Sequence, residues 1–229
     1  MSTGLNADME LTAGTGQKRP AQLGVLLSGR GSNFLAIAES IQNGILKGKA
    51  EIAVVIANVA EAQGLQRARE MGLPAKLLVS KGRKRAEHDA DVADCLREHG
   101  VQLVILAGYM RLLSPEFITA FPDRILNIHP SLLPAFPGLD AQTQAFDYGS
   151  KIAGCTVHFV DEKLDHGVIV LQRSIAVEDD DDAHSLAERL LVEEHVAYSE
   201  AIARVISGQY GVEGRRYMRL SGAAAEPVK

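Results

Sequence analysis

Short runs of apolar residues alternate with amphipathic stretches along most of the chain. Apolar runs in the first half occupy Leu23–Leu27, Ile52–Ile56, Ala75–Val79 and Val101–Leu106. The stretches between them have helical spacing, over Phe34–Gln42, Gly64–Met71 and Arg85–His99. Unbroken apolar strands that alternate with helices are typical of a parallel sheet covered on both faces. The pattern therefore predicts a doubly wound, Rossmann-like unit.

The second half of the chain is richer in β-type runs. Ile125–His129 predicts a strand that leads into a Pro-rich loop, and Ala141–Tyr148 predicts a short helix. The runs Cys155–Val160 and Val168–Ile175 flank a polar turn, which indicates an antiparallel hairpin or a lid loop. Ser185–Ile206 has the spacing of a long helix. We therefore expect an α/β fold with a doubly wound, mostly parallel sheet, a β-rich C-terminal part and a long C-terminal helix.

Composition narrows the class of protein. The chain has 229 residues, of which 46% are hydrophobic and 23% charged, which is enough apolar mass for a globular core. A net charge of -5 and an aromatic content of 5% argue against a nucleic-acid partner. No run reaches the roughly 18 apolar residues of a membrane span, and the N-terminus lacks a signal-peptide core. We expect a cytoplasmic protein with no membrane partner, folded as one domain over residues 21–220 between flexible tails at 1–20 and 221–229.

A Gly-rich loop, Ser28–Asn33 (SGRGSN), follows the first predicted strand. Its glycines would let backbone N–H groups approach an anion, and the helix behind it would add a favourable dipole. It is neither a Walker loop nor a good dinucleotide fingerprint, because Phe34 replaces the third glycine and Asn58 stands where an acid would follow the second strand. The loop suits a monophosphate. A tight turn with a Ser/Asn helix cap is an equally good interpretation.

Asn127 and His129 lie two residues apart at the end of a predicted strand, so their side chains share a face at the ligand-binding edge of the sheet. An amide beside an imidazole can donate to one oxygen as that oxygen gains negative charge. Asp165 is a candidate carboxylate to orient His129, although an Asp in such a turn is commonly only a turn residue. Ser131 lies on a Pro-containing loop, which favours direct attack by a substrate amine over a covalent acyl-enzyme.

Other classes of site have weaker support. No spacing of His, Cys, Asp and Glu predicts a metal site. The acidic run Glu178–Asp182 precedes the long helix, where negative charge complements the helix dipole. The fold alone would also suit a dinucleotide oxidoreductase or a non-catalytic nucleotide-binding module. The incomplete glycine fingerprint counts against the first, and the set Asn127, His129 and Asp165 counts against the second.

Several segments together resemble the phosphoribosylglycinamide formyltransferase family of purine synthesis. They are SGRGSN (28–33), AGYMRLLSPEF (107–117), NIHPSLLPAFPGLDAQTQA (127–145) and GCTVHFVDEKLDHGVIVLQ (154–172). The resemblance runs from about Gln22 to Tyr210 and implies the formyltransferase fold. It also implies an enzyme that uses 10-formyltetrahydrofolate as co-substrate, needs no metal, and transfers the formyl group to the amine of glycinamide ribonucleotide.

The resemblance implies roles for particular residues. The catalytic positions are matched by Asn127, His129 and Asp165. The positions that hold the ribonucleotide are matched by Gly31, Ser32 and Asn33 at the phosphate and by Glu194 at the glycinamide part. The folate-binding positions are matched by Arg85, Met110, Arg111, Leu112, Leu113 and Asn127. On the residues alone, Met110 and Leu113 would equally suit a core and Glu194 a helix surface.

The chain departs from the family pattern at two places. Asp140 and Gln142 stand where relatives carry histidines, and LDHGV (164–168) replaces the commoner LDGGP or LDSGP. We expect His166 and Val168 to alter loop mobility, rates or pH behaviour without changing the reaction. His158 has two equal interpretations, a partner of Asp165 or a buried strand histidine. A 10-formyltetrahydrofolate hydrolase remains the alternative function, and the oligomeric state, a homodimer included, stays open.

Overall fold

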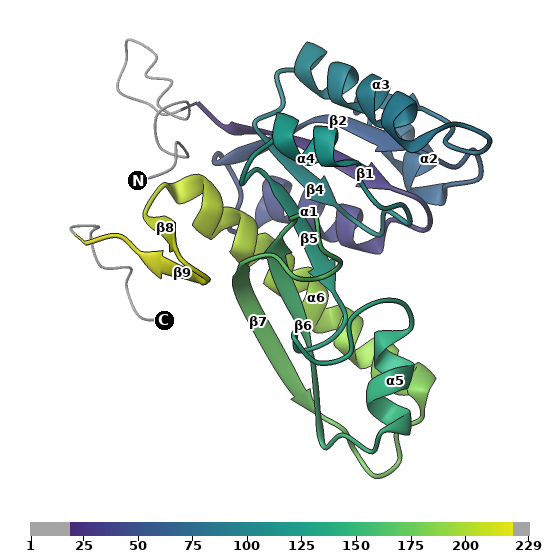
Figure 1. Ribbon diagram of the computed structural model, residues 1–229, viewed down its shortest axis with the longest axis vertical. Coiled ribbons are helices and arrows are strands. Elements are labelled where there is room, and N and C mark those ends of the chain that lie inside the picture. The colour runs from purple at the N-terminus through teal and green to yellow at the C-terminus, as the bar shows by residue number, and fades with distance from the viewer. Residues whose placement is uncertain (1–18, 222–229) are drawn as a thin grey trace.

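Helices cover both faces of a seven-stranded sheet in the computed structural model, which describes residues 19–221 (Figure 1). The strands are β1 (Ala21–Leu27), β2 (Ala50–Ala57), β3 (Ala75–Leu77), β4 (Leu103–Leu106), β5 (Ile125–His129), β6 (Ile152–Phe159) and β7 (Ile169–Ala176). They are ordered β3-β2-β1-β4-β5-β6-β7. Strands β1 to β5 pair in parallel, and β6 and β7 pair antiparallel.

Six helices and a small hairpin complete the described part of the chain. The helices are α1 (Ser32–Asn43), α2 (Gln63–Glu70), α3 (Arg85–Glu98), α4 (Pro115–Ala120), α5 (Ala141–Asp147) and α6 (Ala183–Ser207). The hairpin pairs β8 (Tyr210–Glu213) with β9 (Arg216–Arg219). The predicted doubly wound, mostly parallel α/β sheet with a β-rich C-terminal part and a long terminal helix is confirmed. The expected tails, residues 1–20 and 221–229, lie almost entirely outside the described residues, so the domain limits stay a prediction.

Strands β1, β2, β4 and β5 each supply residues to two cores, one on either face of the sheet. In β1, Leu23, Val25 and Leu27 join the core that also contains residues of α1, α2 and α6. Leu26 points the other way, into the core shared with α3 and α4. Successive side chains of a strand face opposite sides, so a strand buried on both sides has to be continuously apolar. This double burial explains the unbroken runs in the sequence.

The buried Tyr198 fastens α6 to the sheet. Its hydroxyl lies 3.0 Å from the carbonyl oxygen of Leu106 and 2.9 Å from that of Leu126. These carbonyls belong to β4, which leads to the segment 107–114, and to β5, which leads to the Pro-rich loop. The long helix therefore holds together the strands that reach this edge of the sheet.

Two features of the fold were not predicted from the sequence. Helix α4 has only six residues, too few for a periodic pattern, but Ser114 as its cap and Pro115 in its first turn are recognisable start signals. The strands β8 and β9 are four residues each and turn at Gly214. Within residues 19–221 no helix combines the length and apolar character needed to cross a bilayer.

We predict that Tyr198→Phe lowers the free energy of unfolding by about 1–2 kcal/mol, because the two carbonyls lose a buried donor. Urea denaturation measures the change. Tyr148→Phe is the matched control, since Tyr148 is 81% exposed. Equal stability of the two variants would contradict the assigned role of Tyr198.

Candidate active site

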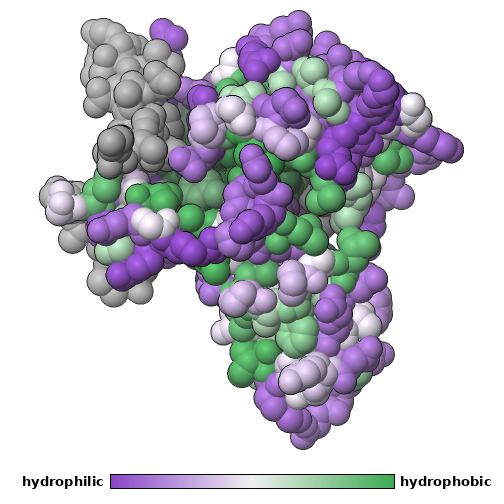
Figure 2. Space-filling model, in the orientation of Figure 1, coloured by the Kyte–Doolittle hydropathy of each residue, from purple (hydrophilic) through white to green (hydrophobic). Residues whose placement is uncertain are grey.

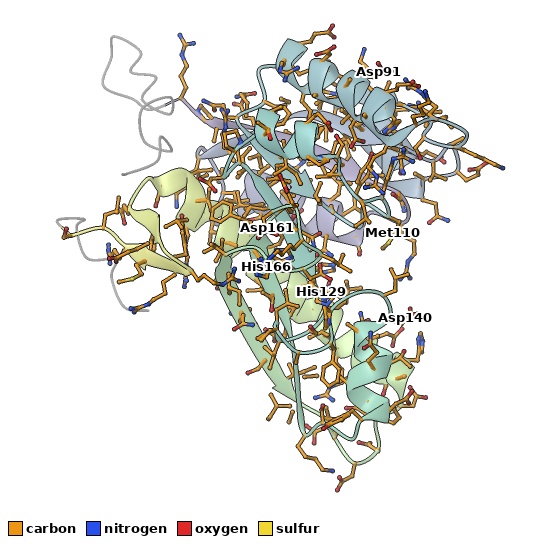
Figure 3. All side chains as sticks on the ribbon, viewed as in Figure 1. Asp91, Met110, His129, Asp140, Asp161 and His166 are labelled. Atoms are coloured by element: carbon orange, nitrogen blue, oxygen red, sulfur yellow. The ribbon has the colours of Figure 1, made fainter. Side chains whose placement is uncertain are left out.

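The candidate residues gather at the edge of the sheet where β1, β4 and β5 end. The strand order reverses between β1 and β4, and open α/β sheets bind ligands at such a point. The loop 160–168 between β6 and β7 reaches the same edge. Figure 3 places His129 at this edge between Met110 and Asp140, which lie on segments that follow β4 and β5.

The strand register brings two catalytic candidates and a histidine together. Strands β5 and β6 pair Asn127 with His158, and Asn127 Nδ2 lies 3.2 Å from His158 Nε2. Asp165 lies between two imidazoles, with Oδ2 3.4 Å from His129 Nδ1 and Oδ1 3.8 Å from His158 Nε2. The structure therefore brings Asn127, His129 and Asp165 together and adds His158 as their common neighbour.

The backbone of the loop 160–168 turns Asp165 inward. Asp165 has a φ of 48°, which is uncommon for a residue with a side chain, and its side chain is 9% exposed. The N–H of Gly138 donates to its Oδ2 at 2.8 Å. A Cβ on Gly167 would lie 1.7 Å from the carbonyl oxygen of Phe159, so only glycine permits this turn. Asp165 is thus a buried acceptor rather than a simple turn residue.

His158 orients the Asn127 amide. Its Nδ1 lies 2.8 Å from the carbonyl oxygen of Phe159, so Nδ1 carries the hydrogen and Nε2 accepts from Asn127 Nδ2. Burial is the largest cause that lowers the pKa of His158, which keeps this ring neutral. One N–H of the amide is thereby held, and the second is left to donate elsewhere. Of the two interpretations of His158, the structure supports the partner in the site.

Both ring nitrogens of His129 face acceptors. Nε2 lies 2.9 Å from the carbonyl oxygen of Phe136, and Nδ1 faces Asp165. A carbonyl oxygen only accepts, so Nε2 carries a hydrogen in this arrangement. Donation from His129 Nε2 to a ligand therefore requires that the Phe136 carbonyl gives way.

The Gly-rich loop packs against α2 and has no side-chain cap at the start of α1. Gly31 is the N-cap of α1 with a φ of 77°, and a Cβ there would lie 2.8 Å from the Cα of Gly64. The alternative of a Ser/Asn cap is therefore wrong. Ser32 and Asn33 form the first turn of α1, where backbone N–H groups have no partner within the helix. These groups suit an anion.

Asn33 and Glu194 form a buried polar pair. Asn33 Nδ2 donates to Glu194 Oε2 at 2.9 Å, and among the described residues Asn33 Oδ1 is buried without a hydrogen-bond partner. Burial raises the pKa of Glu194. Glu194 is therefore not a helix-surface acid, and the pair presents acceptors that suit a ligand rich in N–H or O–H donors.

A hydroxyl that sequence reasoning missed joins two of the segments. Ser28 Oγ donates to Asn58 Oδ1 at 2.6 Å and accepts from the N–H of Met110 at 2.8 Å. Asn58 Nδ2 in turn donates to Ser80 Oγ at 3.1 Å. Asn58 occupies the place where a dinucleotide-binding fold has its acid, and this amide was the sequence feature that could have indicated the contact with Ser28. The amide there holds the loop 28–33 and the segment 110–113 in one arrangement.

The expected folate-binding residues occupy different environments. Met110 and Leu112 are 72% and 56% exposed, so Met110 is not a core residue, whereas Leu113 packs against the core of α3 and α4. Arg111 Nη2 donates to the carbonyl oxygen of Arg83 at 3.4 Å. Arg85 is exposed at the start of α3, and its role stays a prediction. Figure 2 shows apolar residues gathered where this face narrows between the upper and lower parts of the molecule.

A buried pair beneath the segment 110–113 also escaped sequence reasoning. Asp89 Oδ2 accepts from the N–H of Ser114 at 2.6 Å, and His88 Nε2 lies 2.8 Å from the carbonyl oxygen of Leu78. Both side chains belong to α3. Asp89 thereby holds the start of α4 and the end of the exposed segment, and His88 holds the backbone that follows β3.

The acidic run before α6 acts as a cap. Asp182 accepts from the N–H groups of His184 and Ser185 at 2.9 and 2.8 Å, and Asp181 pairs with Arg189. These contacts support the interpretation as helix capping. Within residues 19–221 no three His, Cys, Asp or Glu side chains gather as a metal-binding group. That the reaction needs no metal stays a prediction.

Comparison with known proteins decides the family. A sequence model described as formyl transferase matches residues 21–202. The phosphoribosylglycinamide formyltransferase of Escherichia coli is 37% identical over 186 residues, which are 81% of this chain and 87% of that protein. The chain belongs to the phosphoribosylglycinamide formyltransferase family. The resemblance seen in the sequence is thus confirmed, and so is its fold.

Other similar proteins share the fold, and some are much longer than this chain. The crystal structure of glycinamide ribonucleotide transformylase 1 from Symbiobacterium toebii has a TM-score of 0.84 and 47% identity, and covers 88% of this chain and 95% of that one. The trifunctional purine biosynthetic protein adenosine-3 of Drosophila melanogaster is 40% identical over 83% of this chain, which spans only 14% of that protein. A formyltetrahydrofolate deformylase from Pseudomonas syringae, with 22% identity and a TM-score of 0.81, shares the fold alone.

We predict that His158 is neutral and carries its hydrogen on Nδ1 at pH 6.5, where an ordinary histidine is about half charged. Nitrogen-15 NMR of the imidazoles measures this, with His158→Gln to assign the signal. Because its pKa is lowered, its contribution to stability is present above about pH 6.5 and is lost as the pH falls below that value. A charged His158 ring at pH 6.5 would contradict the assignment.

We predict that Glu194→Gln raises the melting temperature at pH 7–8. A raised pKa means that ionising Glu194 costs folding free energy, so its contribution is favourable below about pH 4.3 and is lost as the pH rises through the folded-state pKa. The difference from the parent protein should shrink towards pH 4. Glu188→Gln is the control, because Glu188 is exposed. A pH-independent difference would argue against this cause.

Proposed function

We propose that this protein transfers the formyl group of 10-formyltetrahydrofolate to the amine of glycinamide ribonucleotide in purine biosynthesis. The products are N-formylglycinamide ribonucleotide and tetrahydrofolate. The observation that carries the proposal is the buried Asp165 carboxylate between His129 and His158, beside an Asn127 amide with one free N–H. Family membership supports it, since the E. coli relative bears the name of this activity.

Asn127 and His129 stabilise the charge that develops in the reaction. The amine attacks the formyl carbon, the C=O bond becomes a C–O⁻ single bond, and the tetrahedral intermediate then releases N10. The free N–H of Asn127 donates to the oxygen as it gains charge, because donors fixed in advance cost no reorganisation. His129 donates beside it once its Nε2 leaves the Phe136 carbonyl.

Asp165 orients His129 and carries the proton between the two substrates. Its carboxylate lies 3.4 Å from His129 Nδ1 and orients the ring next to the oxygen that gains charge. The attacking nitrogen loses a proton and N10 gains one, so the reaction is balanced without any further reagent. Asp165 passes this proton, directly or through water.

The two substrates enter from opposite sides of Asn127. The phosphate binds the N–H groups of Gly31, Ser32 and Asn33, and Glu194 accepts from the donors of the ribonucleotide. The folate lies along Met110, Arg111, Leu112 and Leu113, with Arg85 near its charged end. Holding both substrates at one edge makes the step effectively unimolecular. The cytoplasmic location and the homodimer left open by the sequence stay predictions.

The deciding experiment follows absorbance as the purified protein converts 10-formyltetrahydrofolate to tetrahydrofolate, with and without glycinamide ribonucleotide. The proposal requires turnover that depends on the ribonucleotide and yields its N-formyl derivative. Turnover with water alone as acceptor would establish the hydrolase alternative instead. Folate binding without turnover would assign a binding role.

We predict that Asn127→Asp lowers kcat by at least ~10²-fold, since it removes an oxyanion donor and adds a repelling charge. Asn43→Asp makes the same change on the exposed end of α1 and should leave kcat unaltered. Steady-state kinetics of the two variants measure the difference. Near-normal activity of Asn127→Asp would remove this amide from the mechanism.

A further inference from the structure

The hairpin β8–β9 reaches the loop that carries Asp165. The formyl transferase match ends at residue 202, so this hairpin lies outside the segment by which the family is recognised. In Figure 1 the turn between β8 and β9 points towards the upper end of β7, where the loop 160–168 leads into that strand. Its tip is Gly214 and Arg215.

Arg215 and Asp161 contact His166 from opposite sides. Arg215 Nη2 donates to the carbonyl oxygen of His166, and its Nη1 lies 3.3 Å from His166 Nε2. His166 Nδ1 lies 2.7 Å from Asp161 Oδ2. Nη1 also lies 3.4 Å from His166 Nδ1, so the guanidinium lies against the ring near both nitrogens, while Nδ1 faces the carboxylate of Asp161. Figure 3 shows Asp161 and His166 close together on this loop.

Aromatic contacts fix the base of the hairpin. The ring of Tyr217 packs edge-on against Phe159 with 5.5 Å between centroids, and it stacks on Tyr210 at the same distance. Phe159 is the last residue of β6 and directly precedes the loop. The hairpin is therefore anchored where the loop starts and contacts it again at His166.

We propose that Arg215 and His166 are positioning residues for Asp165, and this inference rests on the proposed function. Asp165 has a left-handed φ of 48°, which a residue with a side chain adopts only when its surroundings hold it there. Gly138 holds its carboxylate on one side. Arg215 holds the carbonyl and ring of the next residue on the other. The backbone at residue 166 supplies the accepting carbonyl, and the departure LDHGV adds an imidazole ring against the guanidinium.

The first test compares kcat of Arg215→Ala with that of Arg216→Ala. Arg216 is exposed on the same hairpin, and among the described residues its side chain has no hydrogen bond or ion pair with the loop. We expect Arg215→Ala to lower kcat roughly fivefold to thirtyfold, with little change in KM for the ribonucleotide and in melting temperature. Arg215→Lys should restore part of the loss, because an ammonium still donates to the His166 carbonyl. Equal kcat in the two alanine variants would overturn the proposal.

The second test asks whether the effect passes through Asp165. In an Asp165→Asn background, Arg215→Ala should cause little further loss of kcat, because the positioned carboxylate is already absent. His166→Ser should reproduce part of the loss in the parent protein and none in this background. A full and additive loss in the Asp165→Asn background would show that Arg215 acts by another route and would overturn the proposal.

A measurement without substrate separates this inference from the proposed function. Hydrogen exchange of the amides 161–167 should be faster in Arg215→Ala than in Arg216→Ala, with unchanged exchange in β5 and β6. If the parent protein lacks ribonucleotide-dependent turnover, the proposed function fails while this comparison still decides whether the hairpin holds the loop. Equal exchange in the two variants would overturn the positioning role.

Discussion

The register between β5 and β6 is the constraint on which the candidate site depends. Antiparallel pairing sets Asn127 opposite His158 and His129 opposite Thr156, so the amide and the neutral imidazole meet at 3.2 Å. A shift by one residue would turn every side chain of the strand to the other face. The loop 160–168 begins directly after β6, so the same register also determines where Asp165 returns to the sheet. The positions of Asn127, His158 and Asp165 therefore depend on one geometric condition.

Hydrogen bonds from polar groups, more than ion pairs, hold the site in shape. Ser28 links the Gly-rich loop to the backbone of Met110, and His158 holds Asn127 by accepting from its amide. Most of these groups are buried or half-buried, where a polar atom without a partner is costly. The buried carboxylates of Asp165 and Glu194 accept hydrogen bonds as well, and each lies where the proposed reaction handles a proton or an amine.

The sequence predicted the sheet well because strands that are buried on both faces consist of consecutive apolar residues. A run such as Leu103–Leu106 can be continuously apolar because both of its faces are covered, as they are in β4. It also located Asn127 and His129, since strand periodicity alone sets them on one face. It could not place Asp165 against His129, because that contact depends on a left-handed residue and on Gly167 in a loop. The bond of Asn33 to Glu194 and the hairpin β8–β9 were equally hidden, since one spans distant elements and the other is too short for a pattern.

The pair of Asn33 and Glu194 has a consequence for how the protein is made. The two residues are 161 positions apart, so the proposed ribonucleotide end of the site joins α1 to α6. As the chain leaves the ribosome, the parallel strands β1 to β5 are complete long before α6 emerges. A partly synthesised chain therefore has the Gly-rich loop and the strand with Asn127 and His129 but no acid beside the loop. The proposed ribonucleotide site is completed last, when α6 packs on the sheet and Tyr198 reaches the carbonyls of β4 and β5.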